Sequence, residues 1–219
     1  MDLQRIAHAV DHTLLDPCCT TEQIEALCRE AKRFEAASVC VPPCHVAAAA
    51  GFLDGALPVC TVIGFPNGYS TRAVKCAETR EAIALGASEI DMVANLCRVR
   101  EGRFDLVEEE IAAVKEACAG RILKVIVETC RLTDEEKRRL CTVVAAGGAD
   151  FIKTSTGFGG GGATFEDVAL LRACSPAALK VKASGGIGSL EDAQRFLDLG
   201  AERLGTSRLL RLIAEATHD

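Results

Sequence analysis

The chain has 219 residues, of which 49% are hydrophobic and 26% are charged, and its formal net charge at pH 7 is −6. This composition is typical of a soluble globular protein with a sizeable core, and it argues against disorder. Because the lysines and arginines are scattered in an acidic chain, neither nucleic acid nor an anionic membrane is an expected partner.

The predicted elements begin with a short N-terminal helix. Short β-branched runs then alternate with longer amphipathic stretches up to the C-terminus, without a linker or a change in composition. This alternation predicts a single domain, 1–219, built from parallel strands that are each followed by a helix. The strands are expected at residues 12–15, 38–42, 59–64, 89–93, 123–128, 151–154, 179–183 and 203–205.

Several of the predicted helices carry local start and stop signals. A hydroxyl residue that caps the first turn is expected at each of Thr20, Thr133, Thr164 and Ser189. A left-handed glycine that ends a helix is expected at each of Gly86, Gly147 and Gly200. Eight strand and helix units predict an α/β protein folded as a (β/α)8 TIM barrel, with an open doubly wound sheet as the alternative.

The cellular compartment and the state of the cysteines follow from what the sequence lacks. The first ten residues contain Asp2, Arg5 and His8, so they do not form the apolar run of a signal peptide, and no other run reaches transmembrane length. We therefore expect a cytoplasmic protein whose 12 cysteines are free thiols, most of them buried. No CxxC pair and no set of cysteines and histidines has the spacing of a zinc site.

Several predicted strands contain charged residues, although a strand in a parallel sheet is normally apolar. These residues are Asp91, Lys124, Glu128, Lys153, Lys180 and Lys182. One such lysine alone is explained by a strand end or by a structural ion pair. Lys153 and Lys182, however, both lie near the C-terminal ends of their strands, where barrels build their active sites. We therefore interpret Lys153 and Lys182 as candidate catalytic residues.

Two lysines in a partly desolvated cavity disfavour each other's charge, so at least one amine is expected to be neutral near pH 7. A neutral amine attacks an aldehyde or a ketone to give an iminium, which assists cleavage or formation of a C–C bond. Asp91 is a candidate for proton transfer at the adjacent carbon. Spacing alone leaves open whether the three side chains converge.

Two glycine-containing turns predict a phosphate site. Ser184-Gly185-Gly186-Ile187-Gly188 follows the seventh strand, Gly205-Thr206-Ser207 follows the eighth, and each leads directly into a helix. Barrel enzymes often bind phosphate at these two loops, although the glycines are also explained as tight turns. Arg208 either adds positive charge there or is a solvated helix residue.

The glycine-rich run at residues 157–162 formally matches a dinucleotide-binding motif. In that fold the next strand ends in an acidic residue, whereas this one ends Lys180-Val181-Lys182-Ala183. We therefore interpret the run as a flexible loop that faces the substrate.

Motifs along the whole chain resemble those of the deoxyribose-phosphate aldolase family. They are Asp11-His12-Thr13-Leu14-Leu15 and the segments at residues 61–66, 89–93, 124–129, 148–157, 181–187 and 203–207. The resemblance implies a class I aldolase that reversibly cleaves 2-deoxy-D-ribose 5-phosphate to acetaldehyde and D-glyceraldehyde 3-phosphate, in deoxyribonucleoside catabolism. It also implies that no metal or organic cofactor is needed, and it makes a homodimer an expected assembly.

The resemblance further assigns roles to single residues. Lys153 would form the Schiff base, Lys182 would lower its pKa, and Asp91 would transfer protons together with Lys182 and a water molecule. Thr156 would lie beside the imine, and the phosphate would be held by Gly185, Gly186, Gly205 and Ser207. Cys40 would lie near the site as a thiol sensitive to aldehydes.

The chain departs from many members of that family at two places. Arg208 stands where a second serine follows the Gly-Thr-Ser motif, so we expect different phosphate contacts on that side. The last residues, 214–219, contain no tyrosine, whereas some relatives use a C-terminal tyrosine to close the site. Neither departure involves the two lysines.

Other interpretations remain open at this point. Another Schiff-base aldolase or transaldolase would act on a different phosphorylated sugar, and product analysis would identify it. A non-catalytic sugar-phosphate binding protein would bind without forming an imine. Metal-dependent chemistry is disfavoured because His8, His12, His45 and His218 show no paired ligand spacing. A hydrogen-bonded Asp11–His12 pair would be structural or would face the cavity, and the structural role is favoured.

Overall fold

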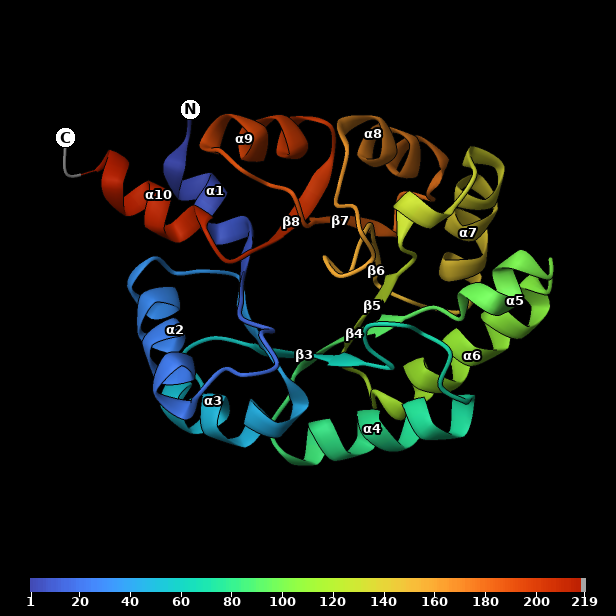
Figure 1. The fold of residues 1–219 in the computed structure, drawn as a ribbon, viewed down its shortest axis with the longest axis horizontal. Helices are drawn as coiled ribbons and strands as arrows, with labels where there is room; N and C mark the ends of the chain where they lie inside the picture. The colour runs from blue at the N-terminus through green and yellow to red at the C-terminus, as the bar shows by residue number, and fades with distance from the viewer. Residues whose placement is uncertain (218–219) are drawn as a thin grey trace.

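The computed structural model describes residues 1–217, so His218 lies outside the described part. Parallel strands form a closed barrel in sequence order, and β8 pairs back onto β1 (Figure 1). The strands are β1 (Val10–Thr13), β2 (Ser38–Val41), β3 (Val59–Ile63), β4 (Glu89–Val93), β5 (Ile122–Ile126), β6 (Phe151–Lys153), β7 (Lys180–Ser184) and β8 (Ala201–Thr206). The closure confirms the predicted TIM barrel and excludes the doubly wound alternative.

The helices surround the barrel, and α1 and α10 lie close to each other (Figure 1). They are α1 (Leu3–Ala9), α2 (Thr21–Arg33), α3 (Val46–Leu53), α4 (Arg72–Ala84), α5 (Leu96–Arg100), α6 (Phe104–Ala117), α7 (Asp134–Ala146), α8 (Phe165–Cys174), α9 (Leu190–Asp198) and α10 (Leu209–Ala216). Short 3-10 turns occupy Pro43–His45 and Thr129–Arg131. Among the helices of the described residues, none combines the length and apolar character required to cross a membrane.

The alternation of side chains along each strand determines where the core lies. In β4, Ile90 and Met92 point outward and join the large apolar cluster between the strands and the helices. Glu89 and Asp91 of the same strand are also buried, but they do not belong to that cluster. The apolar core therefore lies outside the barrel wall, and charged side chains fill much of its interior.

The predicted helix starts are confirmed. Thr20 and Thr133 form capping boxes with the third helical residue, and Thr164 and Ser189 each accept a hydrogen bond from a backbone N–H of the first turn. Gly86 and Gly200 are left-handed, as expected. The prediction for Gly147 is wrong, because this residue is still in a right-handed conformation at the end of α7, with φ of −69°. The left-handed position falls on the next residue, Gly148.

Most predicted strand boundaries differ from the structure by one or two residues, and two of these differences concern charged residues. β1 begins at Val10 instead of residue 12, so the charged Asp11 lies inside the strand. β5 ends at Ile126 instead of residue 128, because Glu128 is left-handed and a 3-10 turn begins at Thr129.

All 12 cysteines belong to the described residues and are free thiols, as predicted. The expectation that most of them are buried is wrong. Six are buried, two are partly exposed and four are exposed. The exposed cysteines lie mainly in loops and helix ends, where the apolar pattern of the barrel does not apply.

Candidate active site

A cavity of about 590 Å³ opens at the C-terminal ends of the strands. Its walls come from the segments that follow β1, β6, β7 and β8. They are formed by Thr13, Leu14, Leu15, Asp16, Pro17, Lys153, Thr156, Gly157, Phe158, Ser184, Gly185, Gly186, Ile187, Gly188, Gly205, Thr206, Ser207 and Arg208. Lys153 and the five residues expected to bind the substrate, from Thr156 to Ser207, all line this cavity. Lys182 and Asp91 lie beneath it.

The two lysines and Asp91 converge, which the spacing in the sequence had left open. Lys153 and Lys182 are direct partners in the register of β6 and β7, so their side chains enter the barrel next to each other. Each Nζ lies 2.7 Å from the same oxygen of Asp91, Oδ2. Lys182 and Asp91 are fully buried, whereas the side chain of Lys153 retains 4% exposure. Lys153 is thus the amine of this group that a ligand in the cavity can reach.

The charged cluster is larger than the sequence indicated. The Nζ of Lys124 on β5 lies 2.8 Å from Asp91 Oδ1 and 2.6 Å from Glu89 Oε2. From the opposite side of the barrel, Asp11 binds Lys182 and Arg203, and Arg203 also lies 2.8 Å from Glu89. Asp11, Glu89 and Arg203 were missed as site residues. Each points into the barrel from its strand. The alternation of inward and outward side chains along the strand was the signal that could have identified these residues.

The neighbouring charges and burial act in opposite directions on the pKa values of the cluster. Burial alone would raise the pKa of Asp91, but Lys124, Lys153 and Lys182 hold it well below its usual range. Burial likewise acts to lower the pKa of Lys182, but Asp11 and Asp91 raise it above the ordinary lysine value. Burial also acts to lower the pKa of Lys124, but the neighbouring carboxylates outweigh it and raise this pKa above the ordinary lysine value. Mutual repulsion of the lysines therefore does not neutralise Lys182, which remains a cation.

The predicted pairing of Asp11 with His12 is absent. Adjacent residues of a strand point to opposite faces, so Asp11 enters the barrel while His12 points outward. The Nε2 of His12 lies 2.7 Å from Glu30 of α2. Burial is the main cause that lowers the pKa of His12. His12 is thus part of the packing between the barrel and α2. Lys180 is also outside the site, because its half-exposed side chain lies 3.8 Å from Glu202.

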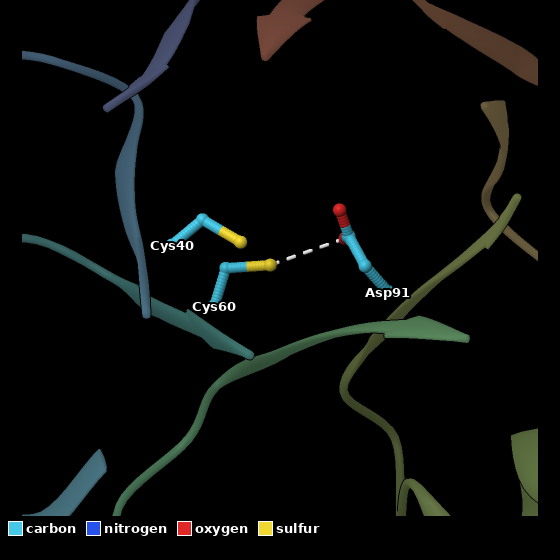
Figure 2. A group of neighbouring side chains, drawn as sticks. All are labelled: Cys40, Cys60 and Asp91. Atoms are coloured by element: carbon cyan, nitrogen blue, oxygen red, sulfur yellow. Dashed lines mark hydrogen bonds between the residues drawn. The ribbon is translucent and has the colours of Figure 1, made fainter. Parts of the chain in front are cut away.

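Two thiols border the cluster on the side of β2 and β3. Figure 2 shows Cys40 and Cys60 pointing toward Asp91, with the Cys60 thiol 3.1 Å from its Oδ1. The two sulfur atoms and a carboxylate oxygen lie within 4.8 Å of one another, a donor set that thiophilic metal ions accept. Asp91, however, already binds the amino groups of three lysines, and the cations Lys124 and Lys182 among them would repel a divalent metal ion. We therefore interpret these contacts as hydrogen bonding.

Cys40 itself is fully buried and does not line the cavity, although it lies close to the lysines. Its hydrogen bond with Cys60 lowers the pKa of the Cys40 thiol, whereas burial raises that of Cys60 well above its ordinary value. Cys60 was not singled out as a site residue, because no local pattern distinguishes it from the other cysteines.

The two glycine-containing loops form one wall of the cavity. Gly185 and Gly186 have consecutive left-handed φ angles of 76° and 73°, which turn the chain at the end of β7. Gly205 lies against this turn, since a Cβ at this position would come within 3.1 Å of the Cβ of Ser184. The hydroxyl of Ser184 is buried and has no hydrogen-bond partner among the described residues. Ser184 also lines the cavity, and the sequence analysis placed it in the predicted phosphate-binding turn without giving it a role of its own.

The loop that follows β6 forms a neighbouring part of the wall and lies against the β7 turn, since a Cβ at Gly185 would lie 3.5 Å from Cα of Gly157. Thr156 donates its hydroxyl hydrogen to Glu128, and its oxygen accepts from the backbone N–H of Phe158 at 3.0 Å. Phe158 also packs edge-on against Phe65, with ring centroids 5.3 Å apart. The start of the glycine-rich run therefore faces the cavity, as expected for a loop that contacts a ligand.

Comparisons with known proteins are consistent across the whole chain. Residues 5–207 match the family described as DeoC/LacD family aldolase. The deoxyribose-phosphate aldolase of Streptococcus agalactiae is 54% identical over 213 residues, which cover 97% of this chain and 96% of that protein. The enzyme of that name from Streptococcus pyogenes is 54% identical over 218 residues, with coverage of 99% and 98%. Among solved structures, the tetrameric deoxyribose phosphate aldolase from Aeropyrum pernix is 30% identical with a TM-score of 0.92, and the match covers 99% of this chain and 92% of that one.

Proposed function

This chain belongs to the DeoC/LacD family of aldolases, and from this membership we propose that it cleaves 2-deoxy-D-ribose 5-phosphate reversibly to acetaldehyde and D-glyceraldehyde 3-phosphate. The observation that carries the proposal is the position of Lys153. Within residues 1–217, it is the one lysine that lines the cavity, and it also contacts the buried charged cluster. An amine in this position meets the requirement for Schiff-base catalysis.

The charges of the cluster support the role of Lys153 as the nucleophile. The carboxylates of Asp11, Glu89 and Asp91 face four basic groups, Lys124, Lys153, Lys182 and Arg203. If all of them were ionised, one buried positive charge would have no counter-charge, which is unfavourable away from water. Lys182 and Arg203 are fixed as cations by two carboxylates each. Lys153, with one carboxylate and access to the cavity, is the group that can release its proton.

The reaction then proceeds through groups that this chain provides. The neutral amine of Lys153 adds to the C1 aldehyde, and loss of water gives the iminium. Removal of the proton from the C3 hydroxyl lets the C2–C3 electron pair move into the iminium, which releases D-glyceraldehyde 3-phosphate and leaves an enamine. Protonation at C2 and hydrolysis release acetaldehyde and the amine. Asp91 and Lys182 adjoin Lys153 and are the groups proposed to move these protons, through a water molecule.

We assign the phosphate to the wall made by Gly185, Gly186, Gly205 and Ser207. Consecutive left-handed residues direct backbone N–H groups to one side, which creates a concave site for an anion. Arg208 lines the same wall and adds a positive charge. The reaction as written uses no metal or organic cofactor, so turnover should be unaffected by a chelator.

One relative bears on the oligomeric state of this protein, because the Aeropyrum pernix aldolase is described as tetrameric. We propose that this chain self-associates as well, with a homodimer as the unit, and that it acts in the cytoplasm. Sedimentation equilibrium of the purified protein would measure the assembly.

The decisive experiment is borohydride trapping with acetaldehyde, followed by mass mapping of the modified peptide. We expect a reduced two-carbon adduct on Lys153, and loss of both the adduct and turnover in Lys153→Ala with the fold retained. An adduct on Lys182 would exchange the roles of the two lysines. Trapping no greater than that of denatured protein would contradict Schiff-base catalysis and leave a binding function.

A further inference from the structure

Glu128 is a buried carboxylate behind the cavity wall, and the reaction described above does not use it. It is 3% exposed and does not line the cavity, whereas Thr156 does. Both oxygens of Glu128 lie 3.3 Å from the backbone nitrogen of Thr156, and Oε2 also accepts the hydrogen of the Thr156 hydroxyl. The carboxylate thus binds both hydrogen-bond donors of one substrate-facing residue.

The backbone and the neighbouring loop hold this carboxylate in place. Glu128 has φ of 55° and ψ of 64°, a left-handed conformation that is strained for a residue with a Cβ. The backbone N–H of the following residue, Thr129, is bound to the carbonyl of Thr154 at 2.9 Å. On the other side, a Cβ added to Gly159 would lie 2.7 Å from Cδ of Glu128. A glycine at position 159 therefore leaves the space that the carboxylate occupies.

These contacts fix the direction of the Thr156 hydroxyl. A threonine hydroxyl has one hydrogen to donate and two lone pairs to offer. The hydrogen is donated to Glu128, and one lone pair accepts from the N–H of Phe158 at 3.0 Å. What remains for a ligand in the cavity is a lone pair. Thr156 can therefore accept a hydrogen bond from a ligand but cannot donate one.

We propose that Glu128 is a positioning residue that keeps Thr156 an obligate acceptor for a hydroxyl of the sugar phosphate. The inference rests on the proposed aldolase function. The open-chain sugar phosphate carries hydroxyl groups between the carbon that reacts with Lys153 and the phosphate, whereas acetaldehyde carries none. Glu128 thereby contributes to selection of hydroxylated substrates, because a group without a hydrogen to donate would leave the oxygen of Thr156 unpaired.

The test compares two reactions of the same amine. Sugar-phosphate cleavage should depend on Glu128 and Thr156, whereas exchange of the acetaldehyde C2 protons with D2O should not. In Glu128→Gln the new amide N–H can donate to the Thr156 oxygen, so the hydroxyl hydrogen of Thr156 no longer has to point at residue 128. Thr156→Val removes the acceptor oxygen altogether. Each variant should lower kcat/KM for cleavage about tenfold to a hundredfold, mainly through KM, with acetaldehyde exchange and borohydride trapping retained. Glu166→Gln, which changes an exposed carboxylate of α8, is the matched control and should match the wild type.

Two further variants separate positioning from a general loss of structure. Glu128→Gln combined with Thr156→Val should be no worse than Thr156→Val alone, because one residue acts through the other. Gly159→Ala, which displaces the carboxylate without altering either partner, should reproduce the loss in cleavage. Additive losses, or equal losses in cleavage and in acetaldehyde exchange, would overturn the proposal. Absence of trapping in the wild type would instead refute the aldolase function itself.

Discussion

Lys182 lies beneath the cavity, so we expect it to affect catalysis through its positive charge and not through contact with the substrate. It is fully buried, and Asp11 and Asp91 raise its pKa despite the opposing effect of burial. Without this cation, Asp91 pairs more strongly with Lys153, and the neutral amine forms only at higher pH. Lys182→Leu should therefore lower kcat/KM about 10²- to 10⁴-fold near neutral pH and move the acidic limb of the pH profile upward.

The measurement is a pH profile of kcat/KM for the wild type and for Lys182→Leu. Lys180→Leu is the matched control, because Lys180 lies on the same strand with a half-exposed side chain and no contact with the cluster. It should leave the profile unchanged. A uniform loss in Lys182→Leu, with no movement of the acidic limb, would show that Lys182 has only a structural role.

The sequence predicted part of this cluster, and the fold explains the rest. Lys153, Lys182 and Asp91 were found because each is a charge in a strand of a parallel sheet, where apolar residues are expected. Asp11 binds Lys182 and Arg203, which lie 171 and 192 residues away in the chain. Such contacts exist only because β8 pairs with β1, and no local pattern specifies the register of that closure. Local alternation indicates that a side chain points inward, but not which charges it meets.

At the level of elements, one buried ion pair joins α4 to α6. Lys75 is fully buried, and its Nζ lies 2.8 Å from both Glu110 and the carbonyl of Val93. Lys75→Met would leave Glu110 buried without a counter-charge, which should lower the free energy of unfolding by about 3–5 kcal/mol. Urea denaturation measures this change.

The same two helices provide the control. Arg72 and Glu109 also join α4 to α6, but both side chains are more than half exposed. Arg72→Ala should therefore cost less than about 1 kcal/mol. A second comparison is Lys75→Met with Glu110→Leu, which should recover most of the loss because no unpaired charge remains. Equal effects of Lys75→Met and Arg72→Ala would contradict the importance of burial.

Element boundaries were predictable where a local signal sets them. Hydroxyl caps identified the starts of α2, α7, α8 and α9, because a cap satisfies backbone groups within its own turn. The predicted start of β1 was two residues too late, because a charged residue such as Asp11 is unfavourable inside a strand unless it has partners, and its partners are distant in the sequence. β5 was extended too far because its apolar run continues to Val127, whereas Glu128 is left-handed and its contact with the distant Thr156 cannot be read from the local sequence.

At the level of the whole molecule, the charged interior of the barrel makes stability depend on pH at both extremes. The pKa values of Asp11 and Asp91 are lowered, although burial opposes this, mainly by the neighbouring lysines. A carboxyl with a lowered folded pKa stabilises the protein above its unfolded pKa of about 4, and this contribution is lost as the pH falls. Lys124 and Lys182 have raised pKa values, so their contribution is complete below about 10.4 and is lost as the pH rises.

The free energy of unfolding should therefore be highest between about pH 4 and pH 10 and should fall on both sides. Because surface groups also titrate, urea denaturation across this range must compare the wild type with Asp11→Asn. The variant should be less stable near neutral pH, since Lys182 and Arg203 lose a partner. Its stability should also fall less steeply in acid, by up to about 1.4 kcal/mol per pH unit for the one proton that position 11 no longer binds. If the free energy of unfolding fell equally steeply in acid for both proteins, the pKa of Asp11 would not be lowered in the folded state. The buried charges inside the barrel would then not explain the loss of stability in acid.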